Sequence, residues 1–303
     1  MDDGLRAVVA AVGRRLSVDV TGAELLHRHS NAVVLLPSAG WVLRIASAPD
    51  VLSRIAASVR LTRRLAENGF TWCVVPADVG PQPFVEMGRV VSVWNRVPAV
   101  PGAVPGGAAL GRLLRELHAQ AVPRVGLTRF DAPFADLLTA VERADGVLSP
   151  AQAAWLRTRI SGLHREWSRI PFSRPWRLIH GDAHPNNAML TRTGDVVMGD
   201  WDHAAIGPRE WDLAQVHYTH RRFRHPSAAE LDAFAEGYGW DIRTWEHLDT
   251  VVHIRELTGL GSYIRTAAER PFARQELQRR LTHLADGDTD TLWRAPPPTQ
   301  RAE

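Results

Sequence analysis

A proline- and glycine-rich segment, residues 97–107 with the sequence VPAVPGAVPGG, divides the chain into two parts with different patterns. Proline lacks a backbone N–H and glycine leaves the backbone unrestrained, so such a run interrupts both strands and helices. Before it, short runs rich in valine and leucine predict strands. After it, apolar residues recur at three- and four-residue steps, which predicts helices. We therefore expect two lobes, a strand-rich lobe at 1–98 and a mainly helical lobe at 99–303.

In the first part, the apolar runs 32–37 and 40–46 flank a Pro-Ser-Ala-Gly turn and predict a β-hairpin. A helix is expected over 49–67, where Leu52, Ile55 and Val59 share one face before Asn68 and Gly69 end it. Further extended segments are expected at 72–75, 84–87 and 90–97.

In the second part, helices are expected over 108–120 and 149–170, the latter with Ser149 as N-cap, Pro150 at the first position and Gln152 completing a capping box. Ser227 and Glu230 predict the same capping arrangement for another helix. Residues 244–284 can form two more helices, with breaks near 259–261 and at Pro271. The tail from about residue 294 is expected to be disordered.

Composition excludes several classes of function. The chain of 303 residues contains no lysine, so a P-loop and a Schiff-base mechanism are both excluded. No G-x-G-x-x-G follows a strand, so the dinucleotide-binding fingerprint is missing as well. The net charge is only +3 and acids and bases are interspersed, which gives no indication of nucleic-acid binding. Cys73 is the single cysteine, so no intramolecular disulfide is possible and a buried structural thiol is expected.

No run approaches the ~20 apolar residues that cross a bilayer, and the first residues are acidic where a signal peptide needs basic ones. We therefore expect a cytoplasmic protein that binds no membrane, and we expect a monomer.

The segment 177–187, RLIHGDAHPNN, carries the chemistry and admits two interpretations. In the first, alternating His180, Asp182 and His184 lie on one face of a strand and bind a transition metal as in a metallohydrolase. In the second, Asp182 and Asn187 act on a hydroxyl and a magnesium ion. The first interpretation can draw further ligands from Asp200, Asp202 and His203.

A turn at Gly194 and Asp195 predicts a short hairpin that returns Asp200 to the loop holding Asp182 and Asn187. Carboxylates about 4 Å apart repel by about 4 kcal/mol at an effective dielectric constant near 20, so the cluster is favourable only around a cation. Because the ligand atoms are hard oxygens, magnesium is the simplest choice.

The motif H-G-D-x-x-x-x-N at 180–187, GDW ending at Trp201 and D-L-A at 212–214 occur in an order that resembles the aminoglycoside phosphotransferase and choline kinase family. Looser similarity covers 29–36, 40–46, 91–99 and 108–120, so the resemblance spans about 26–213. It implies the α+β, bilobal protein-kinase-like fold, with a small antiparallel sheet in the N-lobe and a larger, mainly helical C-lobe.

The resemblance also implies roles for individual residues. Asp182 would accept or orient the proton of the substrate hydroxyl, while Asn187 and Asp200 would hold Mg²⁺ on the phosphates of ATP or GTP. His180 and Asp212 would be structural, and Asp202 would contact the acceptor. The nucleotide would bind between the lobes against Arg44, Trp94, Asn95, Arg96 and Val97.

Two positions depart from the kinase pattern. Arg44 stands where kinases have a lysine, and Ser58 and Arg60 lie near the usual position of its glutamate partner. A non-catalytic pseudokinase that binds nucleotide therefore stays open as an alternative.

The expected reaction transfers the terminal phosphoryl group to a small-molecule hydroxyl. By resemblance the acceptor is an aminoglycoside-type or other antibiotic; the alternative is a metabolic alcohol such as choline, homoserine or a sugar. A cationic acceptor could be met by Asp202, Glu210, Asp232, Glu236, Asp241 and Glu256, with Trp201, Trp211, Tyr218, Trp240 or Tyr263 stacking on it.

Overall fold

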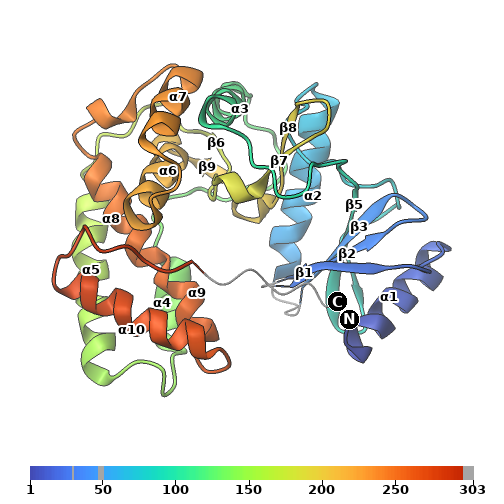
Figure 1. Cartoon of the computed structure of the whole chain (residues 1–303), viewed down its shortest axis with the longest axis horizontal. Coiled ribbons are helices and arrows are strands. Elements are labelled where there is room, and N and C mark those ends of the chain that lie inside the picture. The colour runs from blue at the N-terminus through green and yellow to red at the C-terminus, as the bar shows by residue number, and fades with distance from the viewer. Residues whose placement is uncertain (29–30, 47–50, 296–303) are drawn as a thin grey trace.

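The computed structural model describes residues 1–28, 31–46 and 51–295, and it has two lobes (Figure 1). The smaller lobe contains a five-stranded antiparallel sheet in the order β1-β2-β3-β5-β4. Its strands are β1 (Glu24–Arg28), β2 (Asn31–Leu36), β3 (Trp41–Ala46), β4 (Phe84–Glu86) and β5 (Arg89–Asn95), and its helices are α1 (Asp3–Leu16) and α2 (Leu52–Glu67).

The predicted hairpin is confirmed, because β2 and β3 pair antiparallel across residues 37–40. Helix α2 ends before Asn68 as predicted, while the expected start at 49–50 lies outside the described residues. Residues 72–75 were expected to be extended, but they form no strand of the sheet. Cys73 instead makes an isolated bridge to Met198 and is buried, with a free thiol.

Helix α1 was not anticipated from the sequence. Asp2 caps it by accepting a hydrogen bond from Leu5 N at 2.8 Å. Its apolar face, with Leu5, Val8 and Val12, packs in one core with strand residues such as Val34, Leu43 and Val91. Because side chains alternate along a strand, Arg44 and Trp94 lie on the opposite face of the sheet, where Trp94 packs with Ile55 and Val59 of α2.

The larger lobe is mainly helical. Its helices are α3 (Gly107–Ala119), α4 (Ala135–Glu142), α5 (Pro150–Trp167), α6 (Arg209–Phe223), α7 (Ala228–Tyr238), α8 (Leu248–Thr258), α9 (Leu260–Thr266) and α10 (Pro271–Ala285). Two short antiparallel strand pairs flank the sequence motifs, β6 (Arg177–Ile179) with β9 (Ala205–Gly207) and β7 (Ala188–Leu190) with β8 (Val196–Met198). Short 3₁₀ turns occur at η2 (Pro185–Asn187), η3 (Trp201–His203) and η4 (Ile242–Thr244).

Two details of the helical lobe differ from expectation. The predicted capping box of α5 is present, but Glu230 of α7 does not complete its own box. Its carboxylate instead accepts a hydrogen bond from Gly107 N at the start of α3. Residues 244–284 form three helices, α8, α9 and α10, where two were expected.

Within the described residues, no helix is long and apolar enough to cross a membrane. The tail was expected to be disordered, and its last eight residues, 296–303, lie outside the described part of the chain. Residues 29–30, which begin the segment 29–36 of looser family similarity, lie outside it as well.

Candidate active site

The loop between β6 and β7 is anchored by hydrogen bonds to the carboxylate of Asp212 in α6. One carboxylate oxygen accepts a hydrogen bond from His180 N at 2.7 Å, and the other accepts from Gly181 N at 2.8 Å. His118 of α3 lies 3.2 Å from the same carboxylate. Burial alone would raise the pKa of Asp212, but the hydrogen bond and charge of His118 outweigh it and lower the pKa. Asp212 is thus a structural carboxylate, as predicted.

His180 is completely buried and faces the protein interior. Its Nε2 lies 2.9 Å from Gly199 O, and its Nδ1 lies 3.4 Å from Asp182 N. Both ring nitrogens are therefore engaged by backbone, so the metal centre built on His180, Asp182 and His184 is not formed. No group of three or more His, Cys, Asp or Glu side chains suited to a metal gathers anywhere in the described part of the chain.

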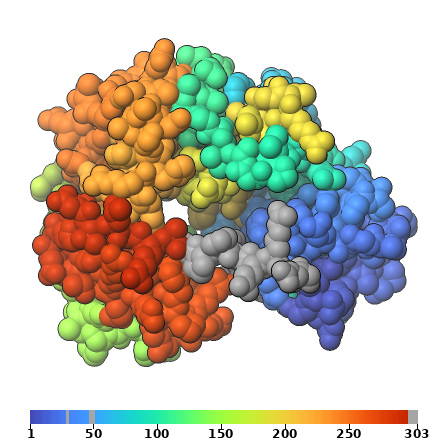
Figure 2. Space-filling view, in the orientation of Figure 1, coloured from blue at the N-terminus to red at the C-terminus, as the bar shows by residue number. Residues whose placement is uncertain are grey.

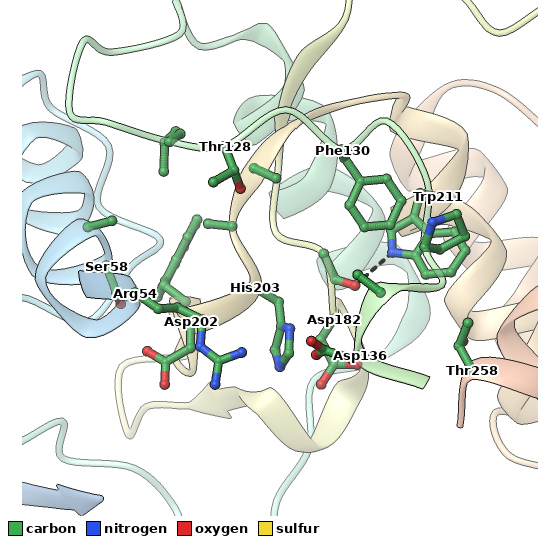
Figure 3. Close-up of a pocket in the computed structure, with 18 of the residues that line it drawn as sticks. Arg54, Ser58, Thr128, Phe130, Asp136, Asp182, Asp202, His203, Trp211 and Thr258 are labelled. Carbon is green, nitrogen blue, oxygen red and sulfur yellow. Dashed lines mark hydrogen bonds between the residues drawn. The ribbon is translucent and has the colours of Figure 1, made fainter. Parts of the chain in front are cut away.

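Gly181 brings this loop against η3. Its φ of +85° lies in the left-handed region, and an added Cβ would stand 2.2 Å from His203 O. Gly181 O accepts a hydrogen bond from Trp211 Nε1 at 2.8 Å, drawn as the dashed line in Figure 3, and a longer one from Arg255 at 3.4 Å. The backbone on both sides of Asp182 is consequently fixed.

Asp182 forms an ion pair with His184, whose Nε2 lies 3.5 Å from its carboxylate. Burial alone would raise the pKa of Asp182, but the charge and hydrogen bond of His184, together with the charges of His203 and Arg255, outweigh burial and hold the pKa well below its usual range. Burial also opposes charge on His184, yet Asp182 raises the pKa of that imidazole. Asp182 is therefore an anion at neutral pH, able to orient a hydroxyl group by accepting its proton in a hydrogen bond.

Asn187 contacts Asp182, and Gly199, the residue before Asp200, donates its N–H to Asn187 O at 2.7 Å. The β7–β8 hairpin pairs Ala188 with Met198, so Asn187 and Asp200 flank its open end. Asn187 Nδ2 donates to Asp182 O at 2.9 Å, which leaves the amide oxygen free to accept. Asp200 is held in a left-handed conformation with φ of +53°. This set of oxygen atoms fits Mg²⁺, which takes one or two protein ligands and completes its shell with water and phosphate oxygens.

Arg44 crosses from β3 to this cluster. Its guanidinium donates to Asp200 at 2.9 Å and to both oxygens of Asp202, at 3.1 and 2.9 Å. The side chains of Arg44 and Asp202 are only 14% and 9% exposed. Asp202 follows Asp200 by two residues and lies on the 3₁₀ turn η3.

The position expected for a glutamate partner on α2 carries no charge. Ser58 is buried, and its hydroxyl has no hydrogen-bond partner among the described residues. Arg44 is paired instead with Asp200 and Asp202, and of these two Asp202 makes the two-oxygen contact.

The family model described as the phosphotransferase enzyme family (APH) matches residues 21–249, about three quarters of the chain. The chain belongs to the phosphotransferase enzyme family. The enzyme is accordingly a small-molecule phosphotransferase, and the kinase-like bilobal fold predicted from its motifs is confirmed.

Solved structures share this fold across nearly the whole chain. An amicoumacin kinase, solved with AMP-PNP, Ca²⁺ and its antibiotic, has a TM-score of 0.72 at 14% identity, covering 97% of this chain and 96% of that one. A choline/ethanolamine kinase family protein from Mesorhizobium loti has 0.65 at 20%, covering 94% and 93%. Spectinomycin phosphotransferase, solved with ADP and spectinomycin, has 0.61 at 14%, covering 93% of each chain. No curated protein sequence matches significantly.

In this phosphotransferase, the expected nucleotide segment, Trp94 to Val97, comprises the last two residues of β5 and the two that follow it. Trp94 is buried, and the N–H groups of Asn95 and Arg96 donate to Val75 O and Gly40 O, at 2.9 Å each. Those two backbone N–H groups are thus already hydrogen-bonded within the protein and are not available to a nucleotide. Any contact of this segment with a nucleotide base falls to its carbonyl groups or to Val97.

A cavity of about 640 Å³ opens beside Asp182 on the side away from the β7–β8 hairpin (Figure 3). Its walls come from α2, the segment 126–136, η3 and helices α6, α8 and α9. Trp201, Trp211 and Tyr218 line it, as expected for stacking residues, and Asp202 borders it. Four charged residues that no sequence pattern indicated also line the cavity: Arg54, Asp136, Arg255 and Arg265. Figure 2 shows the surface hollowed between the lobes.

Proposed function

We propose that this enzyme transfers the terminal phosphoryl group of ATP or GTP to a hydroxyl of a small molecule bound in the cavity beside Asp182. The observation that supports the proposal is that Asn187 donates to Asp182 O on a loop fixed by Asp212, while Gly199 N, next to Asp200, donates to Asn187 O. Phosphoryl transfer depends chiefly on positioning and on charge stabilisation, and a rigid loop provides both.

Asp182 orients the acceptor hydroxyl for in-line attack on the terminal phosphorus. Its lowered pKa favours hydrogen bonding to the hydroxyl over removal of the proton before attack, and the proton leaves as the new P–O bond forms. Asn187 and Asp200 would hold Mg²⁺, which would neutralise charge on the nucleotide phosphates when bound. The bond to the leaving nucleoside diphosphate breaks as the phosphate ester forms.

Arg44 clamps the phosphates, and Asp202 positions Arg44. The sequence assigned Asp202 to the acceptor, but its bidentate contact with Arg44 supports a role in holding that guanidinium. The amicoumacin kinase and spectinomycin phosphotransferase structures hold adenine nucleotides, which favours ATP as co-substrate.

Two groups of acceptor fit a phosphotransferase of this fold. The first is an antibiotic, as in the amicoumacin and spectinomycin enzymes; the second is a metabolic alcohol, as in the choline/ethanolamine kinase family protein. Expression in a sensitive bacterium separates them, because only an antibiotic kinase protects the cell. The cytoplasmic monomer expected from the sequence stays a prediction.

The decisive test is phosphate transfer followed by mass spectrometry. The enzyme is incubated with ATP or GTP, magnesium and a pooled panel of antibiotics and metabolic alcohols, beside Asp182→Ala and Asp200→Ala. A gain of one phosphoryl group on one compound, absent with both variants, supports the proposal and names the acceptor. Absence of both transfer and slow Asp182-dependent nucleotide hydrolysis would contradict it and favour the pseudokinase.

A further inference from the structure

Asp182 lines the cavity, so the cavity is where we place an acceptor hydroxyl. An acceptor must match the charge of these walls, because burying an unpaired charge is costly. The charge of the walls therefore limits the chemical class of the acceptor.

The carboxylates that could have met a cationic acceptor are engaged elsewhere. Glu256 is buried and bonded to Arg222 Nε at 2.6 Å and His253 Nδ1 at 3.1 Å. Asp232 accepts a hydrogen bond from Arg243 at 2.7 Å, away from the cavity. Of the six acids named from the sequence, only Asp202 lines the cavity, and it is paired with Arg44. The two other wall carboxylates are Asp182, paired with His184, and Asp136.

Guanidinium groups outnumber these carboxylates: the walls contain four arginines, Arg54, Arg129, Arg255 and Arg265, against three aspartates. Within the described residues, neither Arg54 of α2 nor Arg265 of α9 forms an ion pair. Figure 3 shows the guanidinium of Arg54 directed into the cavity beside His203. Arg54 belongs to the smaller lobe and Arg265 to the larger, but both line the same cavity, so one bound acceptor could contact both.

Arg255 adds a buried positive charge at the inner wall. Its guanidinium donates to Trp211 O at 2.7 Å and to Gln215 and stacks 3.8 Å above the Trp211 ring. All of its hydrogen-bond acceptors are neutral oxygens, so no carboxylate is directly bonded to it. The charges of Asp182 and Asp212 nevertheless act on Arg255, so the described wall arginines that remain for an anionic ligand are Arg54 and Arg265.

We propose that the acceptor carries a negatively charged group, such as a carboxylate, beside the hydroxyl that is phosphorylated, and that Arg54 and Arg265 bind this group. The inference rests on the proposed function and narrows it. It disfavours polycationic aminoglycosides and choline, which would bring further positive charge to walls that already carry an excess of it. The aromatic rings of Phe130 and Trp211, 4.9 Å apart between centroids, supply the apolar part of the wall.

The test separates a pool of hydroxylated metabolites and antibiotics by ion exchange at neutral pH into anionic, neutral and cationic fractions. Each fraction is incubated with the full-length enzyme, magnesium and ATP labelled in the terminal phosphate. Gluconate, sorbitol and glucamine are run alongside as probes that share a polyhydroxyl chain and differ in charge. We expect label in the anionic fraction. No label there, or label confined to the neutral or cationic fraction, overturns the proposal.

Variants locate the anion site. Arg54→Gln with Arg265→Gln should raise the KM for the labelled acceptor by about tenfold or more, because each charge-assisted hydrogen bond contributes substantially to affinity. Arg63→Gln, an exposed arginine of the same helix α2 outside the cavity, is the matched control. An unchanged acceptor KM in the double variant also overturns the proposal. If instead ATP is neither transferred nor hydrolysed in an Asp182-dependent way, the proposed function itself fails.

Discussion

Arg44 of β3 donates to both carboxylate oxygens of Asp202, with distances of 3.1 and 2.9 Å, and so connects the sheet to the segment that follows β8. The chain contains no lysine and has the neutral Ser58 on α2 where a glutamate partner was sought. The arginine is anchored by the opposite lobe instead. Its planar fork suits this two-oxygen contact, which an ammonium group could not reproduce.

Asp202→Asn should weaken nucleotide use. Losing one charge of a nearly buried bidentate pair frees Arg44, so we expect kcat/KM for ATP to fall about 10- to 100-fold, chiefly through a higher nucleotide KM. Steady-state kinetics with ATP varied measure this. Asp195→Asn, in the β7–β8 turn, is the control and should match the wild type. A higher acceptor KM with an unchanged nucleotide KM would return Asp202 to the acceptor role.

Asp212→Asn should reduce both stability and activity. The amide cannot accept as strongly from His180 N and Gly181 N, and it places a donor against them, so the free energy of unfolding should fall by about 1–3 kcal/mol. Urea unfolding measures that change, and phosphate transfer should fall in parallel. Asp249→Asn, at an exposed carboxylate of α8, should change stability by less than about 0.5 kcal/mol. Equal stability of the two variants would contradict the role of Asp212.

Gly181→Ala tests the close contact between the catalytic loop and η3. A Cβ there would meet His203 O at 2.2 Å, so the loop or η3 must move and Asp182 with it. Gly194 has the same φ of +85° but open space around it, which makes Gly194→Ala a control for backbone strain alone. We expect both variants to lose about 1 kcal/mol through strain and only Gly181→Ala to lose phosphate transfer. Similar activity of the two would show that the contact is unimportant.

His217 of α6 should make the fold sensitive to mild acid. Burial, with a further contribution from the charge of Arg243, lowers its pKa to about 4 from an ordinary value of 6.5. The unfolded chain binds this proton first, so stability is complete above pH 6.5 and decreases as the pH falls towards 4. Each pKa unit corresponds to about 1.4 kcal/mol, so the loss should reach at most about 3 kcal/mol.

The prediction for His217 is tested by measuring the free energy of unfolding at a series of pH values between 4 and 6.5. His217→Asn should remove most of the slope in that range, since its side chain does not titrate. The same slope in the variant and the wild type would assign the acid sensitivity to other groups.

Much of the site was predictable because its residues are close in sequence. The order from His180 to Asn187, the Gly194 turn and Asp200 define a loop and a hairpin whose geometry depends on neighbouring residues, and the structure forms both. The helix N-caps Ser149 and Ser227 were predictable for the same reason. Helix α1 was missed although its apolar spacing was visible, because the first hundred residues as a whole were interpreted as strands.

The sequence by itself determined which oxygen atoms stand on the proposed catalytic loop, and the bilobal order of strands before helices. Only the tertiary structure decided what those groups contact. Arg44 and Asp202 are 158 residues apart, and Glu230 caps a helix that starts 123 residues earlier. The arginines of the cavity come from α2, α8, α9 and the segment before α4. Local propensity depends on adjacent residues, whereas the pairing and net charge of a cavity depend on which distant surfaces the core brings together.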